Sequence, residues 1–294
     1  MSTPLKCLGE DALLARLLTG LPTNGELLVG PGDDCAVVVG NAQYDFLLKT
    51  DVVVEDVHFE RGTDPELIGR KALARCISDI AAMGGLPRHA LVTVLVHRER
   101  SAELLSGVYA GLNRLAAEFG VSVAGGETSS LPVDLLVINV ALTGMVERGC
   151  AVLRSGARPG DIICVTGTLG GSYPGEGHLR FTPRVDVARR LPAESLRPSA
   201  MMDLSDGLGT DLPRLAAASH CGFEVDMDRL PCTPGCSPQR AISDGEDYEL
   251  LMTFSPDVFA RLREHDFGVP ITAIGRMTAS GARGLSPGWQ HFTH

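Results

Sequence analysis

Short acidic stretches recur along the chain, each with glycine or a hydroxyl residue beside its carboxylates. They are GPGDD ending at Asp34, KTD ending at Asp51, SDIAAMGG around Asp79, AGGET around Glu127 and DLSDG from Asp203 to Gly207. Carboxylate oxygens are ligands that Mg²⁺ prefers, and Mg²⁺ can bridge them to the oxygens of a polyphosphate. The chain has no GxxxxGK[ST] loop, so metal ions rather than that loop would hold the phosphate groups. The pattern predicts phosphoryl chemistry.

The composition is that of a soluble, folded protein. Of its 294 residues, 44% are hydrophobic and 21% are charged, which suits one large domain or two of ordinary size. Aromatic residues make up 5%, the net charge is -10, and no Lys/Arg-rich run is present. These features argue against a nucleic-acid-binding protein. Metal ions can still bring an anionic nucleotide to an acidic protein.

The cysteines and the N-terminal sequence predict a cytoplasmic protein. The eight cysteines are scattered, and the close pair Cys232 and Cys236 has no second pair or His cluster to complete a zinc site. We therefore expect reduced, mostly buried thiols. The N-terminal sequence lacks the apolar core of a signal peptide, and the apolar run 90–96 is too short to cross a membrane. We expect no membrane association.

Strands and helices alternate along the first half of the chain. The pattern predicts helices at 9–18, 64–83 and 101–120, and strands at 35–39, 46–54, 90–96, 121–124 and 134–146. Asp64 followed by Pro65 is typical of a helix start. The apolar residues that begin strand 46–54 lead to Thr50 and Asp51, a hydroxyl and a carboxylate that could bind metal together at a strand end. GGET at 125–128 is expected to follow its strand as a loop whose glycines allow a ligand close approach.

The second half has a similar element order but no sequence repeat. A boundary near 147–149 gives two domains, 1–147 and 148–294. Strands are predicted at 161–165, 200–204, 223–227, 248–254 and 271–276, helices at 207–220 and 256–265, and a loop after 281. DLSDGL places Asp203, Ser205 and Asp206 at a strand-to-helix turn, where the helix N-terminus favours an anion. The order of elements fits an α+β or an α/β fold.

Each candidate residue has an ordinary structural alternative. Asp34 could belong to a solvated Gly-Pro-Gly turn, and Asp79 lies just beside the apolar stripe of its helix, where it could face either solvent or a cleft. His58 could be a packed histidine, and Arg154 could be a surface side chain rather than a phosphate clamp. GEDYEL at 245–250 and GWQHF at 288–292 have no chemistry that their spacing reveals.

Taken together and in order, these stretches resemble the thiamine-monophosphate kinases. That family belongs to a superfamily with aminoimidazole ribonucleotide synthetase and selenophosphate synthetase. The matches are collinear and span almost the whole chain: GDDCAVV from Gly32, TDVVVEDVHF at 50–59, SDIAAMGGLP at 78–87, GGET at 125–128, RSGARPGD at 154–161, VTGTLGG at 165–171, DLSDGL at 203–208, GEDYEL at 245–250 and GWQHF at 288–292. Each piece is weak by itself, but the ordered set is specific.

The resemblance implies a two-domain α+β fold of the aminoimidazole-ribonucleotide-synthetase type. In that fold the N-terminal sheets of two subunits pair into a barrel across the axis of a homodimer. The implied reaction transfers the γ-phosphoryl group of ATP directly onto thiamine monophosphate, and several Mg²⁺ ions assist it. Such a transfer requires positioning and charge neutralisation rather than a covalent intermediate.

The matched motifs also imply a role for each candidate residue. The implied metal ligands are Asp34, Thr50, Asp51, Asp79, Glu127, Asp203 and Asp206. The implied nucleotide contacts are Gly126, Glu127, Arg154 and Ser205. The implied contacts to the thiamine phosphate are His58, Glu246 and Trp289, and an aromatic face such as that of Trp289 would favour the cationic thiazolium. Asp51 and Asp206 are assigned as the catalytic residues.

The chain departs from the family pattern in three places. Glu127 stands where these kinases usually have Asp, which keeps the charge and adds one methylene. Lys49 stands where the family commonly has Ser or Thr beside the metals, and our hypothesis is that its ammonium replaces the charge of one metal ion. The stretch 171–199 is shorter than in the family. Its Gly- and Pro-rich part, SYPGEGHLRFTPR, suggests a mobile segment.

Two alternatives stand beside the kinase. A sibling ATP-dependent synthetase, similar to aminoimidazole ribonucleotide synthetase, would suit GGET, although TDVVVEDVHF and GWQHF suit the kinase better. A nucleotide-binding paralogue without activity would be consistent with Lys49 and the short 171–199 stretch. The matched carboxylates argue against that paralogue, because a site without function has no use for so many unpaired acids.

Overall fold

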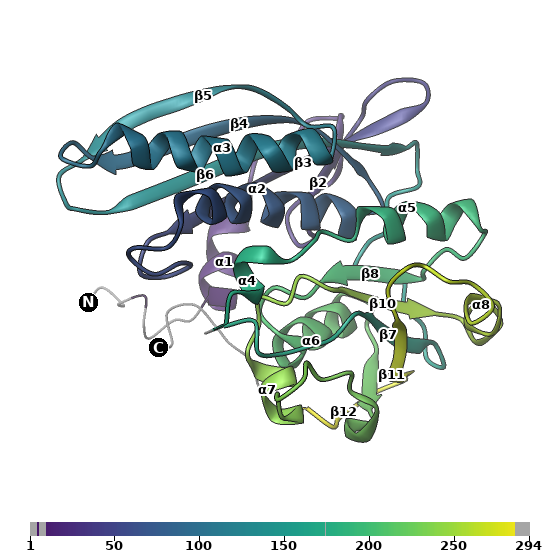
Figure 1. Ribbon diagram of the computed structural model, residues 1–294. Helices are drawn as coiled ribbons and strands as arrows, with labels where there is room; N and C mark the ends of the chain where they lie inside the picture. Colours follow the sequence, from purple (N-terminus) through teal and green to yellow (C-terminus); the bar gives the residue numbers. More distant parts are fainter. Residues whose placement is uncertain (1–4, 6–9, 174, 286–294) are drawn as a thin grey trace, which may run out of the picture.

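Two six-stranded sheets, one from each half of the chain, form the framework of the computed structural model (Figure 1). The structure describes residue 5 and residues 10–173 and 175–285. In the first sheet the strand order is β1-β2-β3-β6-β4-β5, and all neighbours are antiparallel except β4 and β5. Its strands are β1 Leu27–Val29, β2 Ala36–Val38, β3 Tyr44–Val54, β4 Leu86–His97, β5 Ser122–Leu131 and β6 Leu136–Glu147.

Two helices, α2 (Pro65–Ala82) and α3 (Ala102–Glu118), cover one face of the first sheet (Figure 1). The predicted cap of α2 is confirmed, because the Asp64 side chain accepts a hydrogen bond from the backbone N–H of Glu66. Ser101 caps α3 in the same way. A third helix, α1 (Glu10–Leu18), precedes the sheet as predicted. Side-chain capping therefore fixes where the two covering helices begin.

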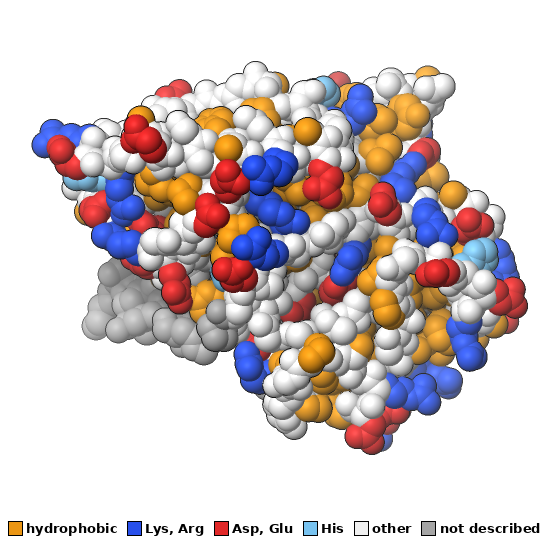
Figure 2. All heavy atoms as spheres, in the orientation of Figure 1, with side chains coloured by type: hydrophobic (Ala, Val, Ile, Leu, Met, Phe, Trp, Pro, Cys, Tyr) orange, Lys and Arg blue, Asp and Glu red, His pale blue; other side chains and the backbone are white. Residues whose placement is uncertain are grey.

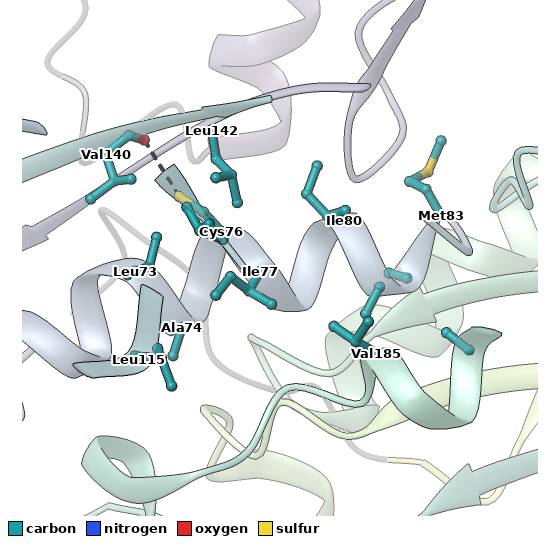
Figure 3. Close-up of a cluster of buried hydrophobic side chains, with 14 of the residues drawn as sticks. Leu73, Ala74, Cys76, Ile77, Ile80, Met83, Leu115, Val140, Leu142 and Val185 are labelled. Carbon is teal, nitrogen blue, oxygen red and sulfur yellow. Dashed lines mark hydrogen bonds between the residues drawn. The ribbon is translucent and has the colours of Figure 1, made fainter. Parts of the chain in front are cut away.

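Helix α2 is buried on two sides, not only along the single apolar stripe that its sequence predicts. One side packs on β3, β4 and β6, and another contacts α4, α5 and β8 of the second half. Figure 3 shows Ile77, Ile80 and Met83 of α2 in the hydrophobic cluster, with Val185 of α5 nearby. Cys76 donates a hydrogen bond to the Val140 carbonyl oxygen at 3.4 Å. The two halves thus share one core built around α2.

The second half forms a sheet of order β12-β9-β11-β7-β10-β8, antiparallel except for β12 and β9. Its strands are β7 Ile162–Thr166, β8 Ala200–Asp203, β9 Gly222–Val225, β10 Leu250–Phe254, β11 Ile271–Thr278 and β12 Ala282–Arg283. Its helices are α4 Gly177–Arg180, α5 Val185–Ala193, α6 Leu208–Ala218, α7 Pro238–Ser243 and α8 Pro256–Leu262, with a 3-10 turn η2 at Met227–Arg229. The elements β1, α4, α5, η2, α7 and β12 were not predicted.

Three sequence-based predictions were wrong. GGET at 125–128 is not a loop: β5 continues through it, paired in parallel with β4. The Gly- and Pro-rich stretch contains α4, whose His178 and Leu179 are buried, and α5 follows it, so hydrophobic packing against α2 orders this region. The segment after 281 begins with the short strand β12 rather than with a loop.

The cysteines are less buried than expected. Of the seven in the described part of the chain, all have free thiols, and only Cys35, Cys76 and Cys164 are buried. None of the helices within the described residues is both long and apolar enough to cross a membrane. Figure 2 shows Lys and Arg side chains intermixed with Asp and Glu on one face of the molecule.

The first sheet is open. Strands β1 and β5 are its edges, so this single chain does not close a barrel. The face covered by α2 and α3 is mostly apolar and largely buried, and the opposite face carries exposed side chains of β3 and β4, including Leu48 and Leu91. The predicted α+β class agrees with the structure.

Candidate active site

Three buried carboxylates meet where the two halves join. Asp34 precedes β2, Asp79 lies near the end of α2, and Asp203 ends β8. One carboxylate oxygen from each lies within 4.8 Å of those of the other two, and we call these residues the acidic triad. Because all three are buried, Asp34 is not part of a solvated turn and Asp79 faces the site rather than solvent.

Each carboxylate of the acidic triad has a protein donor. The three contacts are Lys49 Nζ to Asp79 Oδ1 at 2.8 Å, Arg154 Nη2 to Asp34 Oδ1 at 2.5 Å and Ser78 Oγ to Asp203 Oδ2 at 2.6 Å. Arg154 is therefore a site residue rather than an ordinary surface arginine. The two cations only partly compensate a cluster that also contains the neighbouring Asp33.

The donor set suits a hard divalent cation. Asp34 Oδ2 is buried and has no hydrogen-bond partner among the described residues. An unsatisfied buried oxygen carries a cost unless an ion or water binds it. Beside the oxygens of Asp79 and Asp203, it offers the all-oxygen environment that Mg²⁺ prefers. The residues present thus fit the metal ions that the sequence implies.

Burial makes the carboxyl groups of Asp33, Asp79 and Asp203 harder to ionise, because it raises their pKa values. Burial, together with the charge of Asp34, raises the pKa of Asp203 to about 6. Burial also raises the pKa of Asp79, which the Lys49 ammonium opposes. The same two causes that act on Asp203 raise the pKa of Asp33 to about 6. A divalent cation would favour the ionised forms.

Thr50 and Asp51 lie inside β3 rather than at a strand end. Successive strand residues point to opposite faces, and Asp51 shares with Lys49 the face toward α2. Arg75 of α2 pairs with Asp51, Nη2 to Oδ1, at 3.2 Å. Thr50 Oγ1 instead donates to Asn139 Oδ1 at 3.1 Å. The role of Thr50 as a metal ligand stays a prediction.

A cavity of about 190 Å³ lies beside the acidic triad. Its lining residues are Val57, His58, Arg75, Tyr173, Ser205, Asp206, Asp244, Gly245, Glu246 and Tyr248. Four of them, His58, Ser205, Asp206 and Glu246, are predicted site residues. Sequence reasoning missed Arg75 and Tyr173, and it also missed Tyr248 although that residue lies in the GEDYEL stretch. The cavity wall combines a guanidinium, carboxylates and aromatic rings, which suits a ligand with both phosphate and ring parts.

A fully buried lysine holds Glu246 at the cavity wall. Lys71 of α2 donates to both Glu246 oxygens at 2.8 Å and to the His58 carbonyl at 2.5 Å. Its Nζ also lies 2.7 Å from His178 Nδ1. Burial opposes ionisation of Glu246, but the His178 hydrogen bond and the Lys71 charge outweigh it and lower the pKa of Glu246 to about 2. Glu246 is therefore a fixed negative charge in the cavity.

His58 enters the cavity wall as a neutral ring. Its Nδ1 accepts a hydrogen bond from the backbone N–H of Val54 at 3.1 Å. Burial and the nearby Arg75 guanidinium lower the pKa of His58 to about 4. The predicted site residue is thus well packed and also faces the cavity, so the two interpretations of this histidine are compatible.

The GEDYEL stretch shapes the cavity through its backbone. Glu246 and Tyr248 have positive φ angles of 55° and 51°, which non-glycine residues rarely adopt and which cluster at functional sites. Both side chains line the cavity. Asp247 and Glu249 turn the other way and bind residues of the 166–184 segment. This role depends on backbone conformation, so its spacing could not reveal it.

The remaining predicted residues are not members of the acidic triad, and one of them lies beyond the described part of the chain. Glu127 is exposed on the edge strand β5 and is not a member of the acidic triad. Gly126 lies beside it, where a Cβ atom would come within 1.8 Å of the Val92 carbonyl oxygen. Asp206 is paired with Arg214 of α6. Trp289 lies outside the described residues.

Comparison with known proteins identifies the family. Models of the AIR synthase related protein family match residues 32–146 with the N-terminal domain and residues 165–285 with the C-terminal domain. A thiamine-monophosphate kinase from Rhodopirellula baltica is 37% identical over 295 residues, covering 94% of this chain and 91% of the relative. The chain belongs to the thiamine-monophosphate kinase family. A Bacillus subtilis member is 36% identical, with 84% of each chain covered.

Solved structures agree with this placement in the thiamine-monophosphate kinase family. The structure of AaThiL complexed with AMPPCP and TMP matches with a TM-score of 0.85 and 30% sequence identity, and the match covers 99% of both chains. The predicted family and the two-domain α+β fold of the aminoimidazole-ribonucleotide-synthetase type are confirmed. The individual roles of the site residues stay predictions.

Proposed function

We propose that this chain transfers the γ-phosphoryl group of ATP directly onto thiamine monophosphate, giving thiamine diphosphate and ADP. The observation that carries the proposal is the acidic triad at the junction of the halves, beside a cavity with charged and aromatic walls. Membership of the thiamine-monophosphate kinase family supports the same reaction. The acceptor is a phosphate oxygen that is already anionic, so positioning and charge compensation matter more than a general base.

The metal-binding residues are the acidic triad together with Asp51 and Asp206, which we also assign as the catalytic residues. Thr50 and Glu127 complete the proposed set of ligands. When bound, Mg²⁺ would shield the two phosphate groups from each other and stabilise the charge of the transition state. The Asp34 Oδ2 atom, which is buried without a partner among the described residues, supports its assignment as a ligand.

The nucleotide and the thiamine phosphate would approach the triad from different sides. We assign Gly126, Glu127, Arg154 and Ser205 to ATP, and His58, Glu246 and Trp289 to thiamine monophosphate. The cavity supports the second assignment, because the fixed carboxylate of Glu246 and the faces of Tyr173 and Tyr248 favour a cationic ring. Arg75 joins this cavity to Asp51 and so orients the phosphate side of the site.

The exposed face of the first sheet supports a homodimer. Phe46, Leu48 and Leu91 are 40%, 43% and 52% exposed on the face that α2 and α3 leave uncovered. An apolar sheet face of this kind marks an interaction surface, and pairing it with a second copy would form the barrel implied by the family resemblance. Light scattering is expected to give twice the chain mass of 31.1 kDa; a monomer at micromolar concentration would contradict this proposal.

Two further proposals rest on the sequence. We place the domain boundary between residues 147 and 148, which gives an N-terminal domain 1–147 that carries most metal ligands and a C-terminal domain 148–294 that completes the site. We also propose a cytoplasmic location.

Product analysis tests the proposed reaction. Protein mixed with ATP, Mg²⁺ and thiamine monophosphate is expected to form thiamine diphosphate and ADP in equal amounts, measured by ion-pair chromatography. Omitting Mg²⁺ or thiamine monophosphate is the control and should abolish both products. ADP without thiamine diphosphate would contradict the proposal. An acid-stable ³²P label on the protein would contradict direct transfer.

A further inference from the structure

Lysine is rare in this chain, and one of its lysines, Lys49, lies beside the acidic triad. The sequence has three lysines, at positions 6, 49 and 71, among 26 Lys and Arg residues. Lys49 points from β3 toward the acidic triad, where its Nζ lies 2.8 Å from Asp79 Oδ1. Its side chain is 21% exposed, so the ammonium is mostly withdrawn from water and is compensated by the carboxylates around it.

The ammonium group of Lys49 differs chemically from the guanidinium group of Arg154, the other cation beside the acidic triad. Arg154 carries a planar fork that binds carboxylate or phosphate in a fixed geometry, whereas Lys49 is a compact point charge with three N–H donors. Within residues 10–173 and 175–285, Asp79 is the hydrogen-bond acceptor that Nζ has. Its remaining N–H groups are directed at no other acceptor in this part of the chain and can donate to a phosphate oxygen.

The three carboxylates of the acidic triad differ in the partners that already bind them. Asp34 has an oxygen that is buried without a partner in the described chain, and Asp203 is bound by a neutral hydroxyl. Asp79 is bound by a full positive charge. A divalent ion placed against Asp79 Oδ1 would stand next to the ammonium and be repelled by it, which leaves Oδ2 as the ligand atom of Asp79. Asp203 has no such contact with a cation, and Asp34 pairs with Arg154 through Oδ1 while its Oδ2 has no partner among the described residues.

We infer that Lys49 is a resident cation of the active site, which takes the place and part of the charge of one divalent metal ion at Asp79. The inference rests on the proposed function, since it assigns a task to one residue of that site. Two consequences follow. The triad is held together before any metal binds, and the site takes one divalent ion fewer than it would with a neutral residue at position 49.

Counting bound metal ions tests this inference without relying on turnover. Free Mn²⁺ is measured by electron paramagnetic resonance during titration of the protein with a non-hydrolysable ATP analogue present. Lys49→Ser is expected to bind one more Mn²⁺ per chain than the unmodified protein. In the presence of EDTA, the melting temperature of Lys49→Ser should fall below that of the unmodified protein, and excess Mg²⁺ should restore most of the difference.

Two further variants separate charge from shape. Lys49→Met keeps the length of the side chain without its charge, and is expected to behave as Lys49→Ser does. Lys49→Met combined with Asp79→Asn removes one charge of each sign, and should be as stable in EDTA as the unmodified protein and bind no extra ion. Arg98→Ser, which removes an exposed cation elsewhere, is the control and should change neither measurement.

The possible outcomes are distinct. Equal Mn²⁺ counts for the unmodified protein and both Lys49 variants would overturn the inference. An extra ion in both variants supports it, whether or not the protein makes thiamine diphosphate. If no thiamine diphosphate forms but the ion count still differs, the proposed function is wrong, and the inference that Lys49 replaces one divalent ion is still supported.

Discussion

Replacing Asp51 with asparagine is expected to lower kcat by about 10³-fold, the loss typical of removing one preorganised electrostatic group from an active site. Asp51 lies on the face of β3 that points toward α2, where Arg75 fixes its carboxylate. Its charge acts on both Lys49 and Asp79. The variant keeps the shape and loses the negative charge, so a metal ligand would be weakened and the Mg²⁺ concentration for half-maximal rate should rise.

Asp45→Asn is the matched control for this variant. Asp45 lies on the same strand and the same face of β3, is buried, and accepts a hydrogen bond from the backbone N–H of Gly149 at 2.8 Å. Asparagine preserves that acceptor, and kcat is expected to remain within about threefold of the unmodified protein, as for substitutions outside a catalytic site. If Asp51→Asn also retained its rate and its Mg²⁺ dependence, Asp51 would not be a catalytic metal ligand.

Replacing Lys71 with methionine is expected to destabilise the fold by about 3 kcal/mol, because it leaves the carboxylate of Glu246 without its buried counter-charge. Lys71 is fully buried and contacts Glu246, His178 and the His58 carbonyl. These partners come from both halves, so the loss should also release Glu246 from the cavity wall. Urea unfolding measures the first effect, and the KM for thiamine monophosphate, expected to rise more than kcat falls, measures the second.

A double variant separates the two effects of Lys71. Lys71→Met combined with Glu246→Gln removes both charges, and should regain most of the lost stability without regaining the KM. Lys71→Arg keeps the charge but enlarges the head group in a fully packed position, and is expected to fall between the two. A Lys71→Met protein as stable as the unmodified one would show that the ion pair is not a structural element.

Most helices and strands could be predicted from the sequence, because the residue patterns that specify them are local. Capping residues and hydrophobic periodicity placed α2, α3 and most strands within a few residues. Asp34, Asp79 and Asp203 were recognised through short motifs, yet their meeting depends on the packing of α2 against β8, which no local pattern encodes. The family resemblance, rather than spacing, linked them.

The errors have physical causes. The sequence predicts Gly126 in a loop, but this residue lies in β5, where the backbone of β4 comes too close to it for any side chain to fit. Thr50 and Asp51 were expected at a strand end, but β3 continues through them to Val54. Lys71 was not singled out, since a charge is recognised as buried only when its distant partners are known. The scarcity of lysine was a signal that could have marked both Lys49 and Lys71.

The position of α2 bears on how the chain folds as it is synthesised. Translation delivers about 5–20 residues per second and domains commonly fold as they emerge. Here the first sheet and α2 are complete long before α5 and β8, the elements that cover the other side of α2, are made. The nascent first half must therefore hold an apolar helix surface exposed until the second half arrives. Apolar surface that is exposed in this way favours aggregation, so the shared core of the finished protein is a vulnerability of its nascent first half.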